Sequence, residues 1–134
     1  MKNKHHVLIV DDDADDREII RDAFTHSTAD SEYIFLENGD SLLAYLNQNA
    51  DNGTPSLILL DLNMPGKDGR ETLKEIKTDK RFCQIPTVVF STSSSHRDKN
   101  TSYSLGANCF ITKPDNFNKL VDLAKSITSL WLQQ

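Results

Sequence analysis

The sequence predicts a doubly wound α/β domain, in which a five-stranded parallel sheet carries helices on both faces. Short apolar runs alternate with helix-like segments along the chain, which is typical of repeated strand–helix units. Four of these runs are free of charge and stop at a polar residue, as strands buried in a parallel sheet do. The 134 residues suffice for five units, whereas a closed eight-stranded barrel needs a much longer chain.

The first half of the chain contains two complete strand–helix units and a third strand. A strand near residues 6–11 leads into a helix whose acidic first turn suits the positive end of a helix dipole. A second strand at 33–36 is followed by an Asn-Gly turn and a helix at about 40–48. The third strand, about 57–61, enters residues 63–69, where one proline and two glycines exclude an immediate helix and favour a shaped loop.

The second half of the chain continues the same alternation. We expect a helix near 70–77, a strand at 87–90 and, after three serines that can cap it, a polar helix at 96–105. The fifth strand is about 109–112, and a last helix at about 116–132 follows a Lys-Pro break. Right-handed crossovers between these units give the sheet order 2-1-3-4-5 of flavodoxin-like folds.

Residues that can bind a phosphoryl group or its metal follow four of the strands. They are Asp11 and Asp12 after the first strand, Asp61 after the third, Ser91 after the fourth and Lys113 after the fifth. Ligands of open α/β sheets bind beyond the carboxyl ends of the strands, so we expect these residues to converge in one crevice. Taken singly, each has an ordinary alternative as a helix cap or a solvated loop residue. Their shared position favours the functional interpretation.

The types of these residues indicate phosphoryl transfer assisted by a divalent cation. Three neighbouring carboxylates repel one another unless a cation neutralises them, and hard oxygen ligands favour Mg²⁺ or Mn²⁺ over zinc. Asp61 is the candidate nucleophile, because a carboxylate is ionised at neutral pH and can form an aspartyl-phosphate. Lys113 and the Ser91 hydroxyl would then share the phosphoryl oxygens with the metal.

Composition and charge argue against several other functions. A net charge of -5 and a pI near 5.2, without a Lys/Arg cluster, disfavour nucleic acid and anionic membranes as partners. The apolar stretches fall far short of the roughly 20 residues of a membrane span, and residues 1–10 lack the core of a signal peptide, so we expect a cytoplasmic protein. Cys83 and Cys109 are expected to be free thiols, and His5-His6 an exposed strand entrance.

On these residues, the chain closely resembles the receiver domain of two-component response regulators. The motifs that carry the resemblance are Val10-Asp11-Asp12, Asp61-Leu62-Asn63-Met64-Pro65 with Gly69 beyond, Ser91 after Phe90, and Lys113-Pro114. They cover nearly the whole chain, from about residue 7 to 132. The resemblance implies a single receiver domain at 1–134 with no output domain.

The resemblance also implies roles in the phosphoryl transfer. Asp61 would accept a phosphoryl group from a phosphohistidine of a sensor histidine kinase. Asp12, Asp61 and the backbone carbonyl of Asn63 would hold Mg²⁺, or Mn²⁺ in its place, and Asp11 would help through water. The protein would be a phosphoacceptor in signalling rather than an enzyme, assisting its own phosphotransfer and self-dephosphorylation.

A switch and several rate-setting residues follow from the same resemblance. Ser91 would be the switch hydroxyl and Phe110 the switch aromatic, whose movements re-form the surface of the fourth helix, fifth strand and fifth helix. For Phe110 the alternative is a plain core aromatic. Thr92 departs from the family, which more often carries Ala or Gly there, so we expect altered phosphotransfer or hydrolysis. Asn63 and Ser93 occupy places that influence attack of water on the phosphoryl group.

Expected partners come from a narrower likeness. Residues 61–69 and the Asp-Ala-Asp start of the first helix are similar to the small regulators of bacterial phytochrome-type kinases. We therefore expect a kinase of this type as donor and a downstream protein or phosphotransfer protein as target. A homodimer through the fourth helix, fifth strand and fifth helix is a candidate assembly. The last helix ends its apolar face at Leu130 or Trp131, and Trp131 fits core or edge packing better than a dimer contact.

Two alternative functions stay open at this point. Asp11-x-Asp13 after the first strand, with Ser91 and Lys113, also resembles phosphatases of the haloacid-dehalogenase type, which use an aspartate on the first strand. The sequence lacks the cap segment and late acidic pair of that family. A degenerate receiver that acts only as a binding module is the other alternative, and the presence of every required side-chain type argues against it.

Overall fold

The computed structural model describes residues 5–26, 31–64 and 68–132, and it confirms the predicted sheet. Five parallel strands lie in the order β2-β1-β3-β4-β5. They are β1 His5–Val10, β2 Ser31–Leu36, β3 Leu57–Leu60, β4 Thr87–Ser91 and β5 Cys109–Thr112. Pro65, Gly66 and Lys67 of the loop expected after β3 lie outside the described residues, as do residues 1–4 of the expected N-terminal segment.

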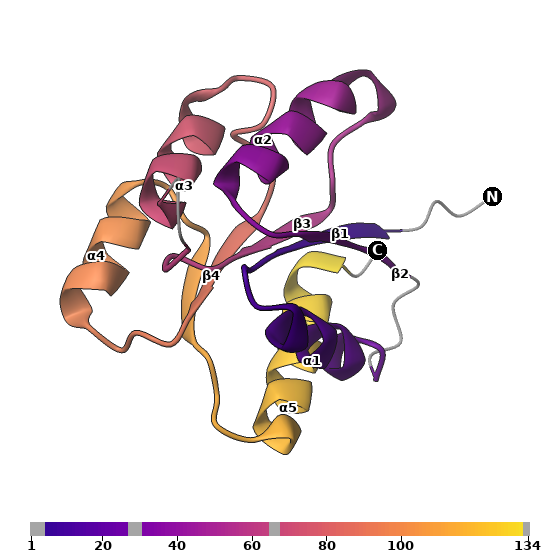
Figure 1. Ribbon diagram of the computed structural model, residues 1–134, viewed down its shortest axis with the longest axis vertical. Helices are drawn as coiled ribbons and strands as arrows, with labels where there is room; N and C mark the ends of the chain where they lie inside the picture. Colours follow the sequence, from indigo (N-terminus) through magenta and orange to yellow (C-terminus); the bar gives the residue numbers. More distant parts are fainter. Residues whose placement is uncertain (1–4, 27–30, 65–67, 133–134) are drawn as a thin grey trace.

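Helices cover both faces of this sheet. They are α1 Ala14–Phe24, α2 Gly39–Gln48, α3 Gly69–Thr78, α4 His96–Ser104 and α5 Phe117–Ile127, with a 3-10 turn at Ala50–Asn52 before β3. Figure 1 shows α1 and α5 together on one face, and α2 and α3 on the other with α4 beside α3. This is the doubly wound arrangement that the alternation of strands and helices predicts.

Successive residues of the central strands pack against opposite helix layers, which explains their continuous apolar runs. Val7 and Ile9 belong to the core cluster with residues of α1 and α5, whereas Leu8 and Val10 belong to the cluster with residues of α2 and α3. These four side chains are at most 1% exposed. Full burial of one such side chain is worth about 2 kcal/mol. The two-sided burial therefore explains why residues 7–10 are all apolar.

A polar side chain caps the start of every α-helix that the structure describes. The caps are Asp13, Asn38, Asp68, Ser95 and Asn116, each accepting hydrogen bonds from backbone N–H groups of the first turn. Ser95 is the last of the three serines expected to cap the fourth helix. The caps leave most helix bounds within one residue of those that the sequence predicts.

The last helix differs from its expected course. The α-helix ends at Ile127 and continues as one π-helical turn, Thr128–Leu132, instead of reaching residue 132 as α-helix. The wider turn rotates Leu130 outward, where it is 70% exposed, while Trp131 packs against the core cluster of α1 and α5. Of the two residues, Trp131 is thus the inward one.

The two cysteines match the sequence-based expectation, and the two N-terminal histidines match it in part. Cys83 and Cys109 are free and half-buried. His6 is exposed, but His5 is half-buried and its Nδ1 lies 3.1 Å from Ser56 Oγ, so only one of the pair is an open strand entrance. Among the described residues, no helix has the length and apolar character to cross a bilayer.

Candidate functional site

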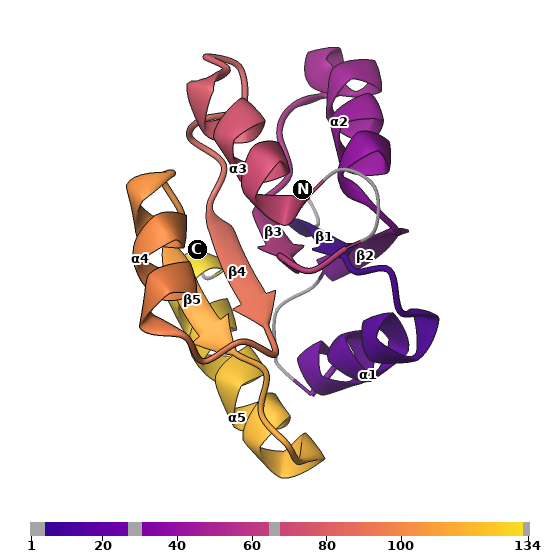
Figure 2. The ribbon, with the colours of Figure 1, turned by 60° about the vertical axis from the view of Figure 1, so that its left-hand side comes forward.

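The carboxyl ends of four strands bring the predicted polar residues to one edge of the sheet. The parallel ladder extends past the strands, because Asp61 N–H donates to the Val10 carbonyl at 3.0 Å and Lys113 N–H donates to the Ser91 carbonyl at 2.7 Å. Figure 2 shows β4 and β5 with their arrowheads at the same end of the sheet. Backbone hydrogen bonding thus sets these residues side by side, as their place in the sequence predicts.

Three carboxylates form the centre of the site. Asp11, Asp12 and Asp61 each offer an oxygen atom, and these atoms lie within 4.8 Å of one another. Asp11 and Asp61 are buried while Asp12 is exposed, so the cluster has a closed floor and an open side. Close carboxylates in a site that opens to solvent on one side suit a hard divalent cation with water in its remaining positions.

Burial dominates the electrostatics of Asp61. Its desolvation raises the pKa of the carboxyl from 3.8 to about 6, against the charge of Lys113 and a hydrogen bond from the Asn63 N–H, which lower it. The neighbouring charges of Asp11 and Asp12 also raise the pKa, by less than burial does, and the value of about 6 includes all of these effects. Three carboxylates so close together repel one another when all are ionised, and a bound cation would relieve that repulsion. The chemistry of the donor set fits Mg²⁺ or Mn²⁺.

Lys113 supplies the cation that the protein itself contributes. Its Nζ lies 2.6 Å from Asp11, 3.2 Å from Asp16 and 3.9 Å from Asp61, and its side chain is 13% exposed. Burial by itself lowers the pKa of Lys113, but the hydrogen bond to Asp11 and the charges of Asp11 and Asp61 outweigh it and raise the pKa. Lys113 is therefore held charged at the edge of the carboxylate cluster.

Ser91 is buried and lies beside the loop that follows Asp61. Its Oγ accepts hydrogen bonds from the Ser93 N–H at 3.1 Å and from the Asn63 amide at 3.4 Å. Two accepted bonds occupy both lone pairs of the oxygen, which leaves the hydroxyl proton for donation. Thr92, the next residue, is exposed, and Ser93 is half-buried.

Phe110 lies further from the carboxylates, on β5. It is partly buried against the core cluster of α2 and α3, and its backbone N–H donates to the Tyr103 hydroxyl of α4 at 3.1 Å. The side chain is neither a fully buried core aromatic nor an open one. This intermediate burial is compatible with either role that the sequence leaves open for it.

A glycine holds the loop after β3 against the α3 start. A Cβ at Gly69 would lie 2.5 Å from the Asp61 carbonyl oxygen and 2.6 Å from Leu62 Cα. The Gly69 N–H also donates to the Leu62 carbonyl at 3.2 Å. Only glycine allows this close approach, so Gly69 helps to set the backbone of Asp61.

Three charged residues beside the site escape sequence reasoning. Asp16 looks like a helix-dipole residue, yet its carboxylate is a second partner of Lys113. Arg70 of α3 and Asp98 of α4 form an ion pair of 2.6 Å next to the Ser93 hydroxyl. Each lies in a helix rather than at a strand end, and its partner is distant in sequence. The contacts Asp16–Lys113 and Arg70–Asp98 therefore become evident only from the way the helices pack in the structure.

The chain matches a known protein family over most of its length. The family model described as the response regulator receiver domain matches residues 7–125. Response regulator Rcp1 of Synechocystis sp. is 40% identical over 130 residues, which cover 95% of this chain and 88% of that protein.

Solved structures of similar proteins share the fold over nearly their whole length. The phosphorylated cyanobacterial phytochrome response regulator RcpA is 41% identical, with a TM-score of 0.89 and coverage of 98% of this chain and 96% of that one. The Mn²⁺-bound form of Rcp1 is 40% identical, with a TM-score of 0.85 and coverage of 97% and 96%.

Proposed function

Because the chain belongs to the response regulator receiver family of two-component systems, we propose that Asp61 is the residue that accepts the phosphoryl group. The observation that carries this proposal is the place of Asp61: its buried carboxylate lies with those of Asp11 and Asp12 and within 3.9 Å of Lys113. A nucleophile needs a phosphoryl group brought to it and the charge of that group neutralised. Lys113 supplies positive charge next to Asp61, and the three carboxylates can hold a divalent cation that supplies more.

The donor is the phosphohistidine of a sensor histidine kinase. A carboxylate oxygen of Asp61 attacks the phosphorus, and the new P–O bond forms as the P–N bond to the histidine breaks. The imidazole keeps the electron pair of that bond and takes up a proton from solvent. Asp61 becomes an acyl phosphate, and Lys113 and the Ser91 hydroxyl hold the phosphoryl oxygens.

Asp11, Asp12, Asp61 and the backbone carbonyl of Asn63 would hold the divalent cation. Bound there, Mg²⁺ or Mn²⁺ supplies positive charge to the phosphoryl oxygens. The Mn²⁺-bound form of the relative Rcp1 and the three clustered carboxylates of this chain support this assignment. Asp11 also keeps Lys113 in place through its 2.6 Å contact.

Return to the resting form is hydrolysis of the acyl phosphate. A water molecule attacks the phosphorus, the carboxylate of Asp61 leaves with its electron pair, and inorganic phosphate is released. Asn63 and Ser93 contact the Ser91 hydroxyl oxygen, and together with the exposed Thr92 next to Ser91 they set the access of that water. The protein thus assists its own phosphotransfer and its own dephosphorylation.

Signalling uses the surface of α4, β5 and α5. The Ser91 hydroxyl moves toward the phosphoryl group, and Phe110 on β5 changes position in response. The hydrogen bond from the Phe110 backbone N–H to the Tyr103 hydroxyl connects this change to α4. A local charge then biases a two-state surface that a downstream protein, a phosphotransfer protein or a second copy of the chain can read. In this proposal, residues 1–134 act as one receiver domain.

Relatives of the chain include phytochrome response regulators, so a phytochrome-type kinase is the first phosphoryl donor to test.

The test is phosphorylation by acetyl phosphate with Mg²⁺, followed by intact mass and acid-labile phosphate analysis. The native protein should gain one phosphoryl group, and Asp61→Asn should gain none. Asp13→Asn is the matched control: it removes a nearby charge, while asparagine caps a helix as well as aspartate does.

Two outcomes would point to the alternative functions. Phosphate mapped to Asp11 instead of Asp61 would indicate a phosphatase of the haloacid-dehalogenase type. Failure of the native protein to acquire phosphate from acetyl phosphate or a kinase, where a control receiver does, would indicate a binding module that has lost the chemistry.

A further inference from the structure

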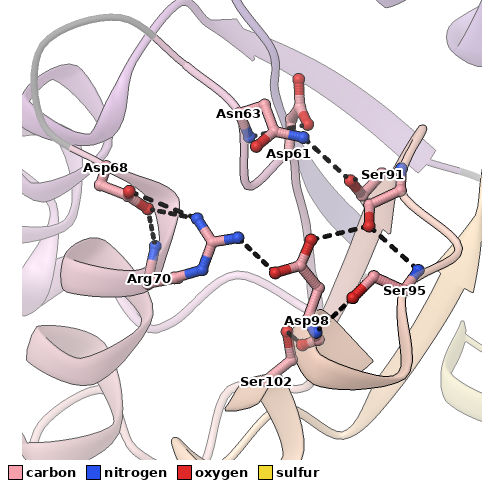
Figure 3. Close-up of polar contacts among 9 residues, drawn as sticks. Asp61, Asn63, Asp68, Arg70, Ser91, Ser95, Asp98 and Ser102 are labelled. Atoms are coloured by element: carbon pink, nitrogen blue, oxygen red, sulfur yellow. Dashed lines mark hydrogen bonds and ion pairs between the residues drawn. The ribbon is translucent and has the colours of Figure 1, made fainter. Parts of the chain in front are cut away.

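The Asp98 carboxylate bridges helix α3 and the connection between β4 and α4. One oxygen accepts a hydrogen bond from Arg70 Nη2 at 2.6 Å, and the other accepts one from the Ser93 hydroxyl at 2.7 Å. Figure 3 shows the Arg70 and Asp98 side chains pointing toward one another across the gap between the two helices. Their side chains are only 31% and 21% exposed, so water screens this pair less than a surface ion pair.

The other end of Arg70 is fixed as well. Its Nη1 lies 3.2 Å from Asp68, the residue that caps α3. The guanidinium group is planar and holds both carboxylates in a defined geometry, which an ammonium group would not do. Arg70 therefore ties the first turn of α4 to the first turn of α3.

Ser93 connects this ion pair to the predicted phosphorylation site. Its hydroxyl donates to Asp98 and accepts from the Ser95 N–H at 3.2 Å, its backbone N–H donates to Ser91 Oγ at 3.1 Å, and its carbonyl accepts from the Thr112 hydroxyl at 3.0 Å. Every polar group of Ser93 thus has a partner. The position of Ser91 Oγ is set through a residue that Asp98 anchors.

We propose that Asp98 is a positioning residue that, together with Arg70, holds the β4–α4 connection in the arrangement described here, in which Ser91 Oγ accepts from the Ser93 N–H. The inference rests on the proposed function of Asp61. A phosphoryl group on Asp61 draws the Ser91 hydroxyl toward it and away from the Ser93 N–H. Any such movement gives up the hydrogen bond from the Ser93 N–H, and the Asp98 carboxylate holds Ser93 in position to donate that bond through a charge-assisted hydrogen bond of its own.

The direction of the effect follows from this geometry. The bonds of Asp98 stabilise the arrangement that the Ser91 movement must leave, so they oppose binding of a phosphoryl group. Removing them lowers the free energy of the phosphorylated arrangement relative to the unphosphorylated one. The site should then bind a phosphoryl mimic more tightly and lose its phosphoryl group more slowly.

The experiment measures the affinity of the full chain for beryllofluoride with Mg²⁺ by calorimetry and by amide NMR. Asp98→Ala and Ser93→Ala, which remove the acceptor and the donor of one hydrogen bond, should each raise the affinity roughly fivefold. The double variant should equal the single ones, because both interrupt the same connection. Arg70→Gln should act in the same direction, and Arg70→Lys should recover part of the native value.

Arg81→Gln is the matched control. It also breaks an Arg–Asp pair, 2.8 Å from Asp79, but on an exposed loop away from Ser93. Its affinity should stay native, and urea unfolding should show all variants folded. Native affinity in Asp98→Ala and Ser93→Ala, weaker binding, or additive effects in the double variant would overturn the inference. Lack of beryllofluoride binding by the native protein would instead overturn the proposed function, and this inference with it.

Discussion

The ammonium group of Lys113 lies 2.6 Å from a carboxylate oxygen of Asp11, although the two residues stand at opposite ends of the chain. Both side chains are largely shielded, with 13% and 3% of their area exposed. A buried ion pair stabilises little by itself, because both charges lose their hydration. Loss of one partner, however, leaves the other charge buried and unpaired.

We therefore expect Lys113→Met to destabilise the metal-free protein by about 3 kcal/mol. The substitution keeps the length of the side chain but leaves Asp11 and Asp61 without their ammonium partner. Urea unfolding in the presence of EDTA measures the loss. Added Mg²⁺ should restore part of the stability, because it supplies positive charge to the same carboxylates.

The control for this prediction is Lys119→Met. Lys119 pairs with Asp115 at 3.6 Å, but the two side chains are 67% and 88% exposed. Exposed pairs contribute little, so the change should stay within about 0.5 kcal/mol. Equal losses for the two lysine variants would show that burial of the Lys113 pair has no special weight.

Metal binding should stabilise the folded protein through the carboxylate cluster. A ligand at 100 times its dissociation constant adds about 2.7 kcal/mol to the free energy of unfolding. Saturating Mg²⁺ should thus raise the Tm of the native protein by several degrees, and EDTA should reverse the shift. Asp12→Asn should abolish most of the shift, because it removes one of the three clustered oxygen ligands. Thermal scans in both conditions measure it.

Asp13→Asn separates ligation from overall charge. It lowers the negative charge next to the cluster by the same amount, yet Asp13 serves as the α1 cap and asparagine can replace it there. This variant should keep the Mg²⁺-dependent shift in Tm. If both variants lost the shift equally, diffuse charge rather than the three-carboxylate cluster would explain the metal effect.

The sequence alone predicts the strand ends and hence most of the site. Asp11, Asp61, Ser91 and Lys113 each follow an apolar run, and a parallel sheet brings the ends of such runs together whatever the details of packing. The sheet order and the burial on both faces follow from the same pattern. Local capping residues such as Ser95 also predict where helices begin.

Contacts between helices need the structure. Arg70 and Asp98 have no shared periodicity, and each reads as an ordinary charged residue near a helix start. Their 2.6 Å contact depends on how α3 and α4 pack side by side. The π-helical turn at the end of α5 is likewise invisible in the apolar spacing, which left Leu130 and Trp131 equivalent.

Asp98 gives a prediction for the pH dependence of stability. The hydrogen bond from Ser93, then the contacts with Arg70 and the charge of Arg97, lower the pKa of Asp98 below its usual 3.8. A lowered pKa in the folded state stabilises the protein above the pKa of the unfolded state, and this contribution is lost as pH falls through the folded-state value. The native protein should therefore exceed Asp98→Asn in stability at pH 7, with a smaller difference below pH 4.

Urea unfolding of both proteins between about pH 3 and pH 7 provides the measurement, with metal removed throughout. Other carboxyl groups titrate equally in the two proteins, so only the difference between them counts. Asp79→Asn is a useful comparison. Asp79 lies on an exposed loop, and hydrogen bonds from Arg81 lower the pKa of its carboxyl. A difference for Asp98→Asn that grew as pH fell would contradict the assigned partners.

Thr92 gives the last prediction, on the lifetime of the phosphoryl group. Its β-branched side chain is exposed and directly follows the buried Ser91. Thr92→Ala should widen access to Asp61, so that acetyl phosphate and water both react faster and the lifetime shortens. Phosphate release after removal of the donor measures it. Ser94→Ala, also exposed but two residues further along the chain, should leave the lifetime native. An unchanged lifetime in Thr92→Ala would mean that access to Asp61 is set by other residues, with Asn63 and Ser93 the next to substitute, because both contact the Ser91 hydroxyl oxygen.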